Sequence, residues 1–378
     1  MKNVILYQDG SSDDYIALCF ITAMLRKGHV NLSGVITAGT GEVDARCGLR
    51  NVAAICQTLN LRDLLLGQGE DKRIQAEHGQ NFPAYIREFI DDLPTLIGLG
   101  QSTNTHRCAN AVEAFHEIIS KSEEPVLIIS TGPLTDLARL FEQYPQDKKH
   151  IEIVMMGGAV HTLGNIQDLD PHIPNKLGEW NIFADTAAAK NVIASGVPLT
   201  MVPLDVTKHI QVTEQFYNEL GDLAERNGKT AVSLAYNLIK ALKIAFEKEH
   251  PEINFFDVYY LWDPFAAMVA LEPQIAKIEE KYIKVDLQTG KTEEVSGSGE
   301  GIGHVRVAMD IAKPAPEILH HLLEAIASLT PPDMKHEAVT VPPFTLFGSN
   351  KGARLNLQIG ISNRAFNAIL QRYWGLNL

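Results

Sequence analysis

Short runs of apolar residues alternate along the chain with longer stretches in which apolar residues recur every three or four positions. The short runs, rich in Val, Ile and Leu, predict β-strands at residues 4–6, 32–37, 126–130, 151–156 and 197–204. The longer stretches predict helices at residues 13–26, 44–59, 110–121, 133–144 and 184–195. This alternation is typical of an α/β fold, so we expect a doubly wound, mostly parallel central sheet.

The pattern changes after the fifth predicted strand. Residues 212–248 are mainly helical in pattern, and residues 259–271 predict a buried helix. We expect a β-rich piece that includes residues 282–287 and 305–309, followed by a helix at 316–329.

A Pro-rich segment begins after residue 329 and leads to a last amphipathic helix predicted at residues 363–373. We therefore expect a main domain at residues 1–329 and a C-terminal extension, a Pro-rich arm plus a helix, at 330–378.

Composition narrows the class of protein. The chain has 378 residues, 45% of them hydrophobic, which is enough to bury a large core. The net charge of -13, without a basic stripe, argues against a nucleic-acid partner. Four scattered cysteines indicate reduced thiols. The sequence shows no signal-peptide pattern and no apolar run of transmembrane length, so we expect a cytoplasmic protein with no membrane partner.

The segments that follow the predicted strands are polar and rich in small residues. They read YQDGSSDD, TAGTGE, STGPLTD, MMGGAVHTLGN and VPLDVTKH. Because ligands bind beyond the C-terminal ends of the strands in such sheets, these segments form the candidate site.

Three acids, Asp9, Asp13 and Asp14, follow the first predicted strand. Asp13 and Asp14 begin a helix, where carboxylates cap free backbone N–H groups and complement the helix dipole. Asp9 has no such role, and its spacing from Asp14 allows a loop and a helix start to converge on one cation. Phosphatases also place a nucleophilic Asp here. Their second Asp, two residues later, is replaced by Ser11.

Three other positions admit a structural and a functional interpretation. Glu179 and Asn181 flank Trp180, and in an extended segment they would point to one face and could hold sugar hydroxyls; the alternative is a polar loop around one buried Trp. Asp263 precedes a Pro at the start of a helix, as a cap or as a ligand. Thr131 lies in a strand-to-helix turn. This turn can be purely structural, whereas a functional role requires that the backbone carbonyl of Thr131 point into the site.

Taken together, these segments resemble the nucleoside hydrolase family in the same order along the chain. The last three acids of its motif D-x-D-x-G-x-D-D correspond to Asp9, Asp13 and Asp14. Further matches are T-G-P-L-T at 131–135, M-G-G at 156–158, G-N at 164–165, E-x-N at 179–181, L-D-V-T at 204–207 and an Asp-led helix at Asp263. The chain is most similar to the purine-preferring inosine-adenosine-guanosine branch, through Asp9-Gly10, Trp180 and the YYLWD segment at 259–263.

The resemblance implies hydrolysis of the N-glycosidic bond of purine ribonucleosides to free base and ribose, as in purine salvage. It places a Ca²⁺ ion between the carboxylates of Asp9, Asp14 and Asp263 and the backbone oxygen of Thr131. All of these are hard oxygen donors, which suit Ca²⁺. The metal lowers the pKa of a water, and Asp9 acts as the general base while that water attacks C1′.

The resemblance also assigns the substrate contacts. The ribose-binding residues are Asp13, Met156, Asn165, Glu179 and Asn181. The base-binding residues are Trp180 and Trp262, with Tyr85 as the second stacking wall. Trp262 occupies the position at which another branch carries a His, so a histidine acid there is excluded. Similar proteins are homodimers or homotetramers, and the expected partner is a small-molecule nucleoside.

The sequence departs from the family pattern at several points. Tyr7 replaces the first Asp of the motif, Glu42 stands where relatives carry Asn or Asp, and the connection at 165–179 is longer than usual. Tyr7 motivates an alternative, a non-catalytic nucleoside-binding or ribose-binding protein on the same scaffold. A magnesium-dependent, phosphatase-like hydrolase is the third hypothesis, and it already lacks its second Asp.

Overall fold

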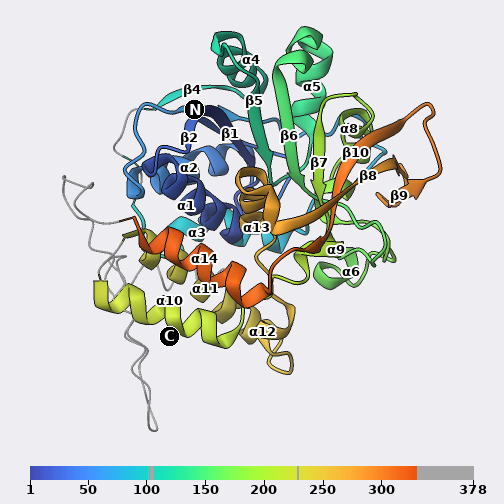
Figure 1. The fold of residues 1–378 in the computed structure, drawn as a ribbon. Coiled ribbons are helices and arrows are strands. Elements are labelled where there is room, and N and C mark those ends of the chain that lie inside the picture. Colours follow the sequence, from blue (N-terminus) through green and yellow to red (C-terminus); the bar gives the residue numbers. More distant parts are fainter. Residues whose placement is uncertain (101, 103–105, 228–229, 330–378) are drawn as a thin grey trace.

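A ten-stranded sheet with the order β4-β3-β2-β1-β5-β6-β7-β10-β8-β9 runs through the protein, with helices on both of its faces (Figure 1). The computed structural model describes residues 1–100, 102, 106–227 and 230–329. The strands are β1 (Lys2–Gln8), β2 (Val30–Thr37), β3 (Leu65–Gln68), β4 (Arg107–Asn110), β5 (Val126–Ser130), β6 (Ile151–Met156), β7 (Leu199–Val202), β8 (Ala276–Val285), β9 (Thr292–Val295) and β10 (Ile302–Ile311). All neighbours from β4 to β10 are parallel, and β8 pairs antiparallel with both β10 and β9.

The helices differ widely in length. In the first part of the chain they are α1 (Ser12–Arg26), α2 (Ala45–Thr58), α3 (Ala84–Leu96), α4 (Ala111–Lys121), α5 (Thr135–Gln143), α6 (Ile166–Leu169), α7 (Trp180–Phe183) and α8 (Thr186–Ile193). They continue with α9 (Leu204–Thr207), α10 (Glu214–Asn227), α11 (Thr230–Glu249), α12 (Phe255–Val258), α13 (Trp262–Leu271) and α14 (Ala315–Ala327). Two 3-10 turns lie at Pro145–His150 and Pro273–Ile275.

The topology places a crevice at the centre of the sheet. From β1 the chain builds outward through β2, β3 and β4, and it then returns to add β5 on the other side of β1. The connections that leave β1 and β5 therefore go in opposite directions, which opens a crevice beyond the ends of these two strands. Asp9 follows β1 and Thr131 follows β5, so both residues lie at this switch point.

Alternate side chains of β1 enter two different cores. Val4 and Leu6 pack on the face covered by α1, α13 and α14, whereas Ile5 and Tyr7 pack on the face covered by α4, α5 and α8. Figure 1 shows the second group of helices on the opposite side of the sheet from α1 and α14. A strand buried on both faces has no polar alternation, which explains the continuous apolar run at the start of the sequence.

The structure confirms the predicted fold class and the strands and helices predicted in the first 200 residues, with ends that shift by a few residues. The helical stretch predicted at 212–248 is two helices, α10 and α11. The extension at 330–378, including the helix predicted at 363–373, lies outside the described residues.

Several elements were not predicted, among them strands β3 and β4 and helix α3. Strands β3 and β4 have four residues each, and β4, the edge strand with the sequence RCAN, is largely exposed and carries no apolar pattern. Helix α3 contains Pro94, which ordinarily signals a helix end. Short length and an edge position leave β3 and β4 without a periodic pattern, whereas α3 is amphipathic and its internal proline is the feature that argues against a helix.

The long connection between β6 and α7 forms a small core of its own. Ile166, with Leu169 and Ile173, packs against Phe82 and Trp180. The backbone closes the base of this segment, since the Gly164 N–H donates to the Lys176 carbonyl at 2.8 Å and the Asn165 N–H donates to the Gly178 carbonyl at 3.1 Å. The inserted residues are therefore part of the folded body.

No helix in the described ranges combines the length and the apolar character needed to cross a bilayer.

We expect Ile166→Ala to lower the free energy of unfolding by about 2–5 kcal/mol, because the substitution leaves a cavity beneath Trp180 at a fully buried site. Leu163→Ala is the matched control in the same connection, because Leu163 is 64% exposed, and it should change stability by less than about 0.5 kcal/mol. Urea denaturation followed by circular dichroism measures both. Equal effects of the two substitutions would contradict a packed insertion.

Candidate functional site

Three carboxylates from distant parts of the chain meet at the switch point. Asp9 follows β1, Asp14 lies in the first turn of α1, and Asp263 lies in the first turn of α13. All three are buried. Asp9 and Asp263 both lie close enough to Asp14 to act on its pKa. The structure therefore brings the three predicted carboxylates together.

The turn between β1 and α1 determines where these acids lie. Gly10 has a φ of 89°, a backbone conformation that residues with a side chain rarely adopt. Ser11 is the N-cap of α1, and its backbone N–H donates to Asp14 Oδ2 at 2.8 Å. Asp14 Oδ1 accepts a hydrogen bond from Thr131 Oγ1 at 2.5 Å. The capping interpretation was thus correct for Asp14, which also faces the other site acids.

Two glycines that were not predicted as site residues allow the backbone to close around Asp9. A Cβ atom added to Gly41 would lie 2.1 Å from Asp9 Oδ2, and one added to Gly132 would lie 2.8 Å from Asp9 Cβ. The N–H of Glu42, next to Gly41, donates to Asp9 Oδ2 at 3.1 Å. The glycine-rich segments TAGTGE and STGPLTD carried this signal, because only glycine permits so close an approach.

Asp13 and Glu42 extend the acidic cluster. The Asp263 N–H lies 3.4 Å from Asp13 Oδ2, which accepts its hydrogen bond. Burial, followed by the charge of Asp14, raises the pKa of Asp13 to about 7. Glu42 is partly exposed as a residue, but its carboxyl group faces the cluster: burial and the charges of Asp13 and Asp14 raise its pKa to about 8.

The same two causes act on the remaining acids. Burial, and then the charges of Asp14 and Glu42, raise the pKa of Asp9 well above its usual range. Burial, and then Asp13 and Asp14, do the same to the pKa of Asp263. Burial raises the pKa of Asp14 against the hydrogen bonds that it accepts. Each of these carboxyl groups therefore holds a proton more tightly than it would in water.

In the described part of the chain, no basic side chain pairs with these acids. Among the described residues, Asp9, Asp13, Asp14, Glu42 and Asp263 form no ion pair with Lys, Arg or His. The acids are also not arranged as a ready-made metal site, since no group of three or more His, Cys, Asp or Glu side chains in the described part of the chain has that arrangement. The raised pKa values of Asp9 and Asp14 reflect this uncompensated burial.

A second group of predicted residues lies beside Thr131. The amide Nδ2 of Asn181 donates to the Thr131 carbonyl at 3.2 Å and lies 3.4 Å from the carbonyl and from Sδ of Met156. The side chain of Glu179 accepts hydrogen bonds from the N–H groups of Gly158 at 2.9 Å and Asn181 at 2.8 Å. Thr131, Met156, Glu179 and Asn181 therefore belong to one hydrogen-bonded group.

The local conformation of this group differs from the prediction. Glu179 and Asn181 do not lie on an extended segment, because Glu179 is the N-cap of α7 and Asn181 is inside that helix. Asn165 supports the helix from outside, as its Oδ1 accepts the Trp180 N–H at 3.1 Å. The expectation of an extended segment was wrong because a carboxylate at an N-cap position satisfies several helix N–H groups at once.

The aromatic residues predicted to contact the base occupy three different environments. Trp180 is buried and stacks on Phe82 at 4.6 Å between ring centroids. Trp262, partly exposed, precedes Asp263 and contacts the edge of Tyr259 at 5.6 Å. Tyr85 is 62% exposed, and its hydroxyl donates to the Leu169 carbonyl at 2.6 Å. The role of all three in base binding stays a prediction.

Tyr7 does not join the acidic cluster. Its hydroxyl donates to Asp136 Oδ2 at 3.0 Å and accepts the Asp136 N–H at 3.1 Å, on the face of the sheet covered by α4 and α5. Its ring contacts Phe115 edge to face, with the centroids 5.3 Å apart. The alternation of side chains along β1 thus directs Tyr7 away from the other acids.

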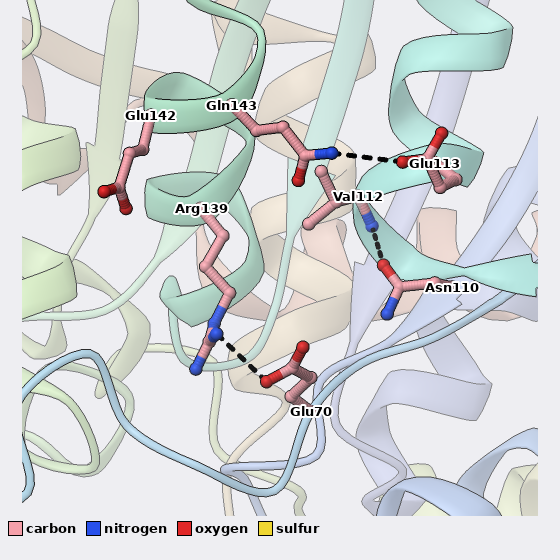
Figure 2. A pocket seen from close by; sticks show the side chains of 7 residues that line it. All are labelled: Glu70, Asn110, Val112, Glu113, Arg139, Glu142 and Gln143. Atoms are coloured by element: carbon pink, nitrogen blue, oxygen red, sulfur yellow. Dashed lines mark hydrogen bonds and ion pairs between the residues drawn. The ribbon is translucent and has the colours of Figure 1, made fainter.

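A separate surface pocket of about 420 Å³ lies between the start of α4 and the second half of α5 (Figure 2). Its lining includes Glu70, Glu113, Arg139 and Glu142, and Arg139 pairs with Glu70 at 2.9 Å. None of the predicted site residues lines it. The acidic cluster and this pocket are different places in the molecule.

The sequence is similar to known ribonucleoside hydrolases. A probable ribonucleoside hydrolase from Dictyostelium discoideum is 33% identical over 185 residues, which are 47% of this chain and 51% of that protein. The pyrimidine-specific ribonucleoside hydrolase RihA from Escherichia coli is 32% identical over 220 residues, which are 56% of this chain and 65% of that protein. The matched segments thus span less than two thirds of either relative.

Solved structures show the same fold. A purine-preferring ribonucleoside hydrolase from Gardnerella vaginalis superimposes with a TM-score of 0.70 at 23% identity, over 87% of this chain and 99% of that one. An inosine-uridine preferring nucleoside hydrolase from Bacillus anthracis gives a TM-score of 0.68 at 23% identity, over 87% of this chain and 100% of that one. The sequence pattern of the family described as inosine-uridine preferring nucleoside hydrolase matches residues 4–315. The predicted resemblance is confirmed at the level of the family, whereas the purine-preferring branch stays a prediction: the chain belongs to the inosine-uridine preferring nucleoside hydrolase family.

Proposed function

We propose that this protein hydrolyses the N-glycosidic bond of purine ribonucleosides, giving free base and ribose, with Asp9 as the general base and Ca²⁺ as the cofactor. The observation that carries the proposal is the convergence of Asp9, Asp14, Asp263 and Thr131 at the switch point of the sheet, in a cluster of buried acids with no basic partner among the described residues. Membership of the family supports ribonucleosides as the substrate class.

The donor set fits a hard cation. Carboxylates and a backbone carbonyl are oxygen ligands, which Ca²⁺ prefers, and the buried negative charge requires compensation. The carboxylates of Asp9, Asp14 and Asp263 and the carbonyl of Thr131 would hold the ion. The carboxyl groups must be ionised to bind the ion, and the Thr131 carbonyl, which accepts one hydrogen bond from Asn181 Nδ2, has a second lone pair for it. Bound Ca²⁺ would offset the carboxylate charge and make a nearby water more acidic.

The protein's own groups have distinct roles. A carboxylate oxygen of Asp9 accepts the proton of the attacking water, and the packing of Gly41 and Gly132 fixes its position. Asp13 and Glu179 accept hydrogen bonds from ribose hydroxyls, and Asn165 and Asn181 orient the Glu179 segment while Met156 contacts the sugar. The carboxylates around the sugar stabilise the positive charge that develops as the base departs.

The proposed preference for purines is more specific than the proposed hydrolysis of ribonucleosides, and it rests on the aromatic residues. Trp262 lies next to Asp263 and is partly exposed, so it can contact a base bound beside the acidic cluster. Trp180 is 2% exposed and stacks on Phe82, so it can add little contact to a base. The relatives include both a pyrimidine-specific and a purine-preferring protein, so a substrate panel decides between the two classes.

We expect purified protein with Ca²⁺ to release free base from inosine, adenosine and guanosine faster than from uridine and cytidine, as measured by chromatography. Asp9→Asn should lower kcat/KM by about 10²-fold to 10⁴-fold, the usual contribution of a general base. Asp222→Asn is the matched control, since Asp222 pairs with Arg226 on the exposed surface of α10, and it should retain full activity.

Other results would identify the alternatives. Ribonucleoside binding in calorimetry without release of base would indicate a binding protein rather than an enzyme. Magnesium-dependent release of phosphate from a phosphomonoester would favour the phosphatase-like hypothesis. Faster release from uridine and cytidine would contradict the purine preference and leave the hydrolase assignment standing.

The proposal also predicts the pH dependence of stability. In the protein stripped of cations, Asp13 and Glu42 keep their protons up to about pH 7 and pH 8, whereas the unfolded chain loses them near pH 4. The folded state therefore binds more protons in this window, and the free energy of unfolding falls as the pH rises from about 4 to about 8. We expect urea midpoints in a chelator to decrease accordingly.

Ca²⁺ should reverse this trend, because it replaces the protons as the compensating charge and binds better to ionised acids. Asp13→Asn should reduce the slope of stability against pH, while Asp222→Asn should leave the slope unchanged. A midpoint in chelator that is independent of pH would contradict the uncompensated burial of these acids.

A further inference from the structure

The pair formed by Tyr7 and Asp136 joins the two segments that carry Asp9 and Thr131. Tyr7 lies two residues before Asp9 on β1, and Asp136 is in the first turn of α5, which follows Thr131. The phenol donates to the carboxylate at 3.0 Å and accepts the backbone N–H of the same residue at 3.1 Å. Two reciprocal bonds between the same two residues fix both the distance and the orientation of the pair.

The same segments are tied a second time through the backbone. The Thr131 N–H donates to the Tyr7 carbonyl at 2.7 Å, and Thr131 Oγ1 lies 3.4 Å from that oxygen. Between the two ties, Gly132 packs so closely on Asp9 that an added Cβ would lie 2.8 Å from Asp9 Cβ. A small shift of either segment must therefore change the distance between Asp9 and Thr131.

Other contacts hold Asp136 and its helix in place. The Glu70 N–H donates to Asp136 Oδ1 at 3.3 Å, and a Cβ on Gly69 would lie 2.3 Å from Asp136 Oδ2. The neighbouring Thr135 hydroxyl donates to Asp185 Oδ2 at 2.8 Å. Tyr7 thus bonds to a carboxylate that the fold fixes from two other directions.

Burying this pair is costly, and the fold does not need it for packing alone. Asp136 is 1% exposed, and it has no ion pair among the described residues. A phenylalanine at position 7 would preserve the edge-to-face contact with Phe115. The hydroxyl and the carboxylate therefore add directional bonds where apolar groups would fill the same volume.

We propose that Tyr7 and Asp136 are positioning residues, whose hydrogen bonds set the separation of Asp9 and Thr131 and so the affinity of the site for its cation. The inference rests on the proposed function, because it takes Asp9 and Thr131 as ligands. It explains how the chain could keep a cation site although Tyr7 replaces the first motif Asp. The carboxylate of Asp136 on α5 would take the place of that Asp and hold β1 through the Tyr7 hydroxyl.

The test is calorimetric titration of Ca²⁺ into the metal-stripped full chain. Tyr7→Phe removes one hydroxyl and should weaken Ca²⁺ binding by about 10-fold to 100-fold, the usual effect of removing a group that orients a ligand. Asp136→Asn keeps an oxygen that can accept the phenol's hydrogen bond, and it should retain affinity within about threefold. Tyr144→Phe is the matched control, since its hydroxyl donates to Glu113 at 3.0 Å on the surface.

Activity separates positioning from a structural role. At saturating Ca²⁺, Tyr7→Phe should recover the wild-type kcat, with only the Ca²⁺ concentration for half-activation raised. Wild-type Ca²⁺ affinity in Tyr7→Phe, with a lower urea midpoint as the only change, would overturn the inference and leave the proposed function intact. A wild-type protein that binds no Ca²⁺ would overturn both.

Discussion

Uncompensated negative charge, buried at one point of the sheet, is the constraint on which the rest of this structure depends. Asp9, Asp14 and Asp263 are withdrawn from water, and among the described residues no Lys, Arg or His neutralises them. Backbone N–H groups and a hydroxyl that donate to these acids offset only part of the cost. Protonation, cation binding and folding therefore form one linked equilibrium at this site, because each changes the charge that the fold must tolerate.

The topology of the sheet explains why the charge gathers at this point. Strands β1 and β5 are adjacent although much of the chain separates them, and their following segments leave in opposite directions. Helix α13 packs against α1 and delivers Asp263 from far along the sequence to the same end. The order of the sheet and the packing of α13 on α1 together bring the three acids to one place. The fold thus brings acids from distant parts of the sequence close enough to repel one another. In the proposed function, a bound cation offsets this repulsion.

The sequence was most informative where one physical signal dominated. Buried parallel strands and long amphipathic helices were predicted because hydrophobic periodicity is strong there, and the acids and glycines at the strand ends indicated the site. The edge strand β4 was missed because it has no such periodicity, and helix α3 was missed although it is amphipathic, because its internal proline argues against a helix. The helical conformation at Asn181, the burial of Trp180 beneath Phe82 and the bond from Tyr7 to Asp136 depend on contacts between distant segments. No local pattern records such contacts.

The close approach of Gly41 and Gly132 to Asp9 limits how this protein could be engineered. Replacing a loop glycine by alanine often stabilises a protein by about 0.4–1 kcal/mol, because it restricts the unfolded chain. Alanine cannot stabilise the protein at these two positions, because its Cβ atom would overlap the carboxylate or the Cβ atom of Asp9. The conformational entropy that these two glycines give to the unfolded chain therefore cannot be reduced by substituting them. Stabilisation of this protein has to be sought at a distance from Asp9.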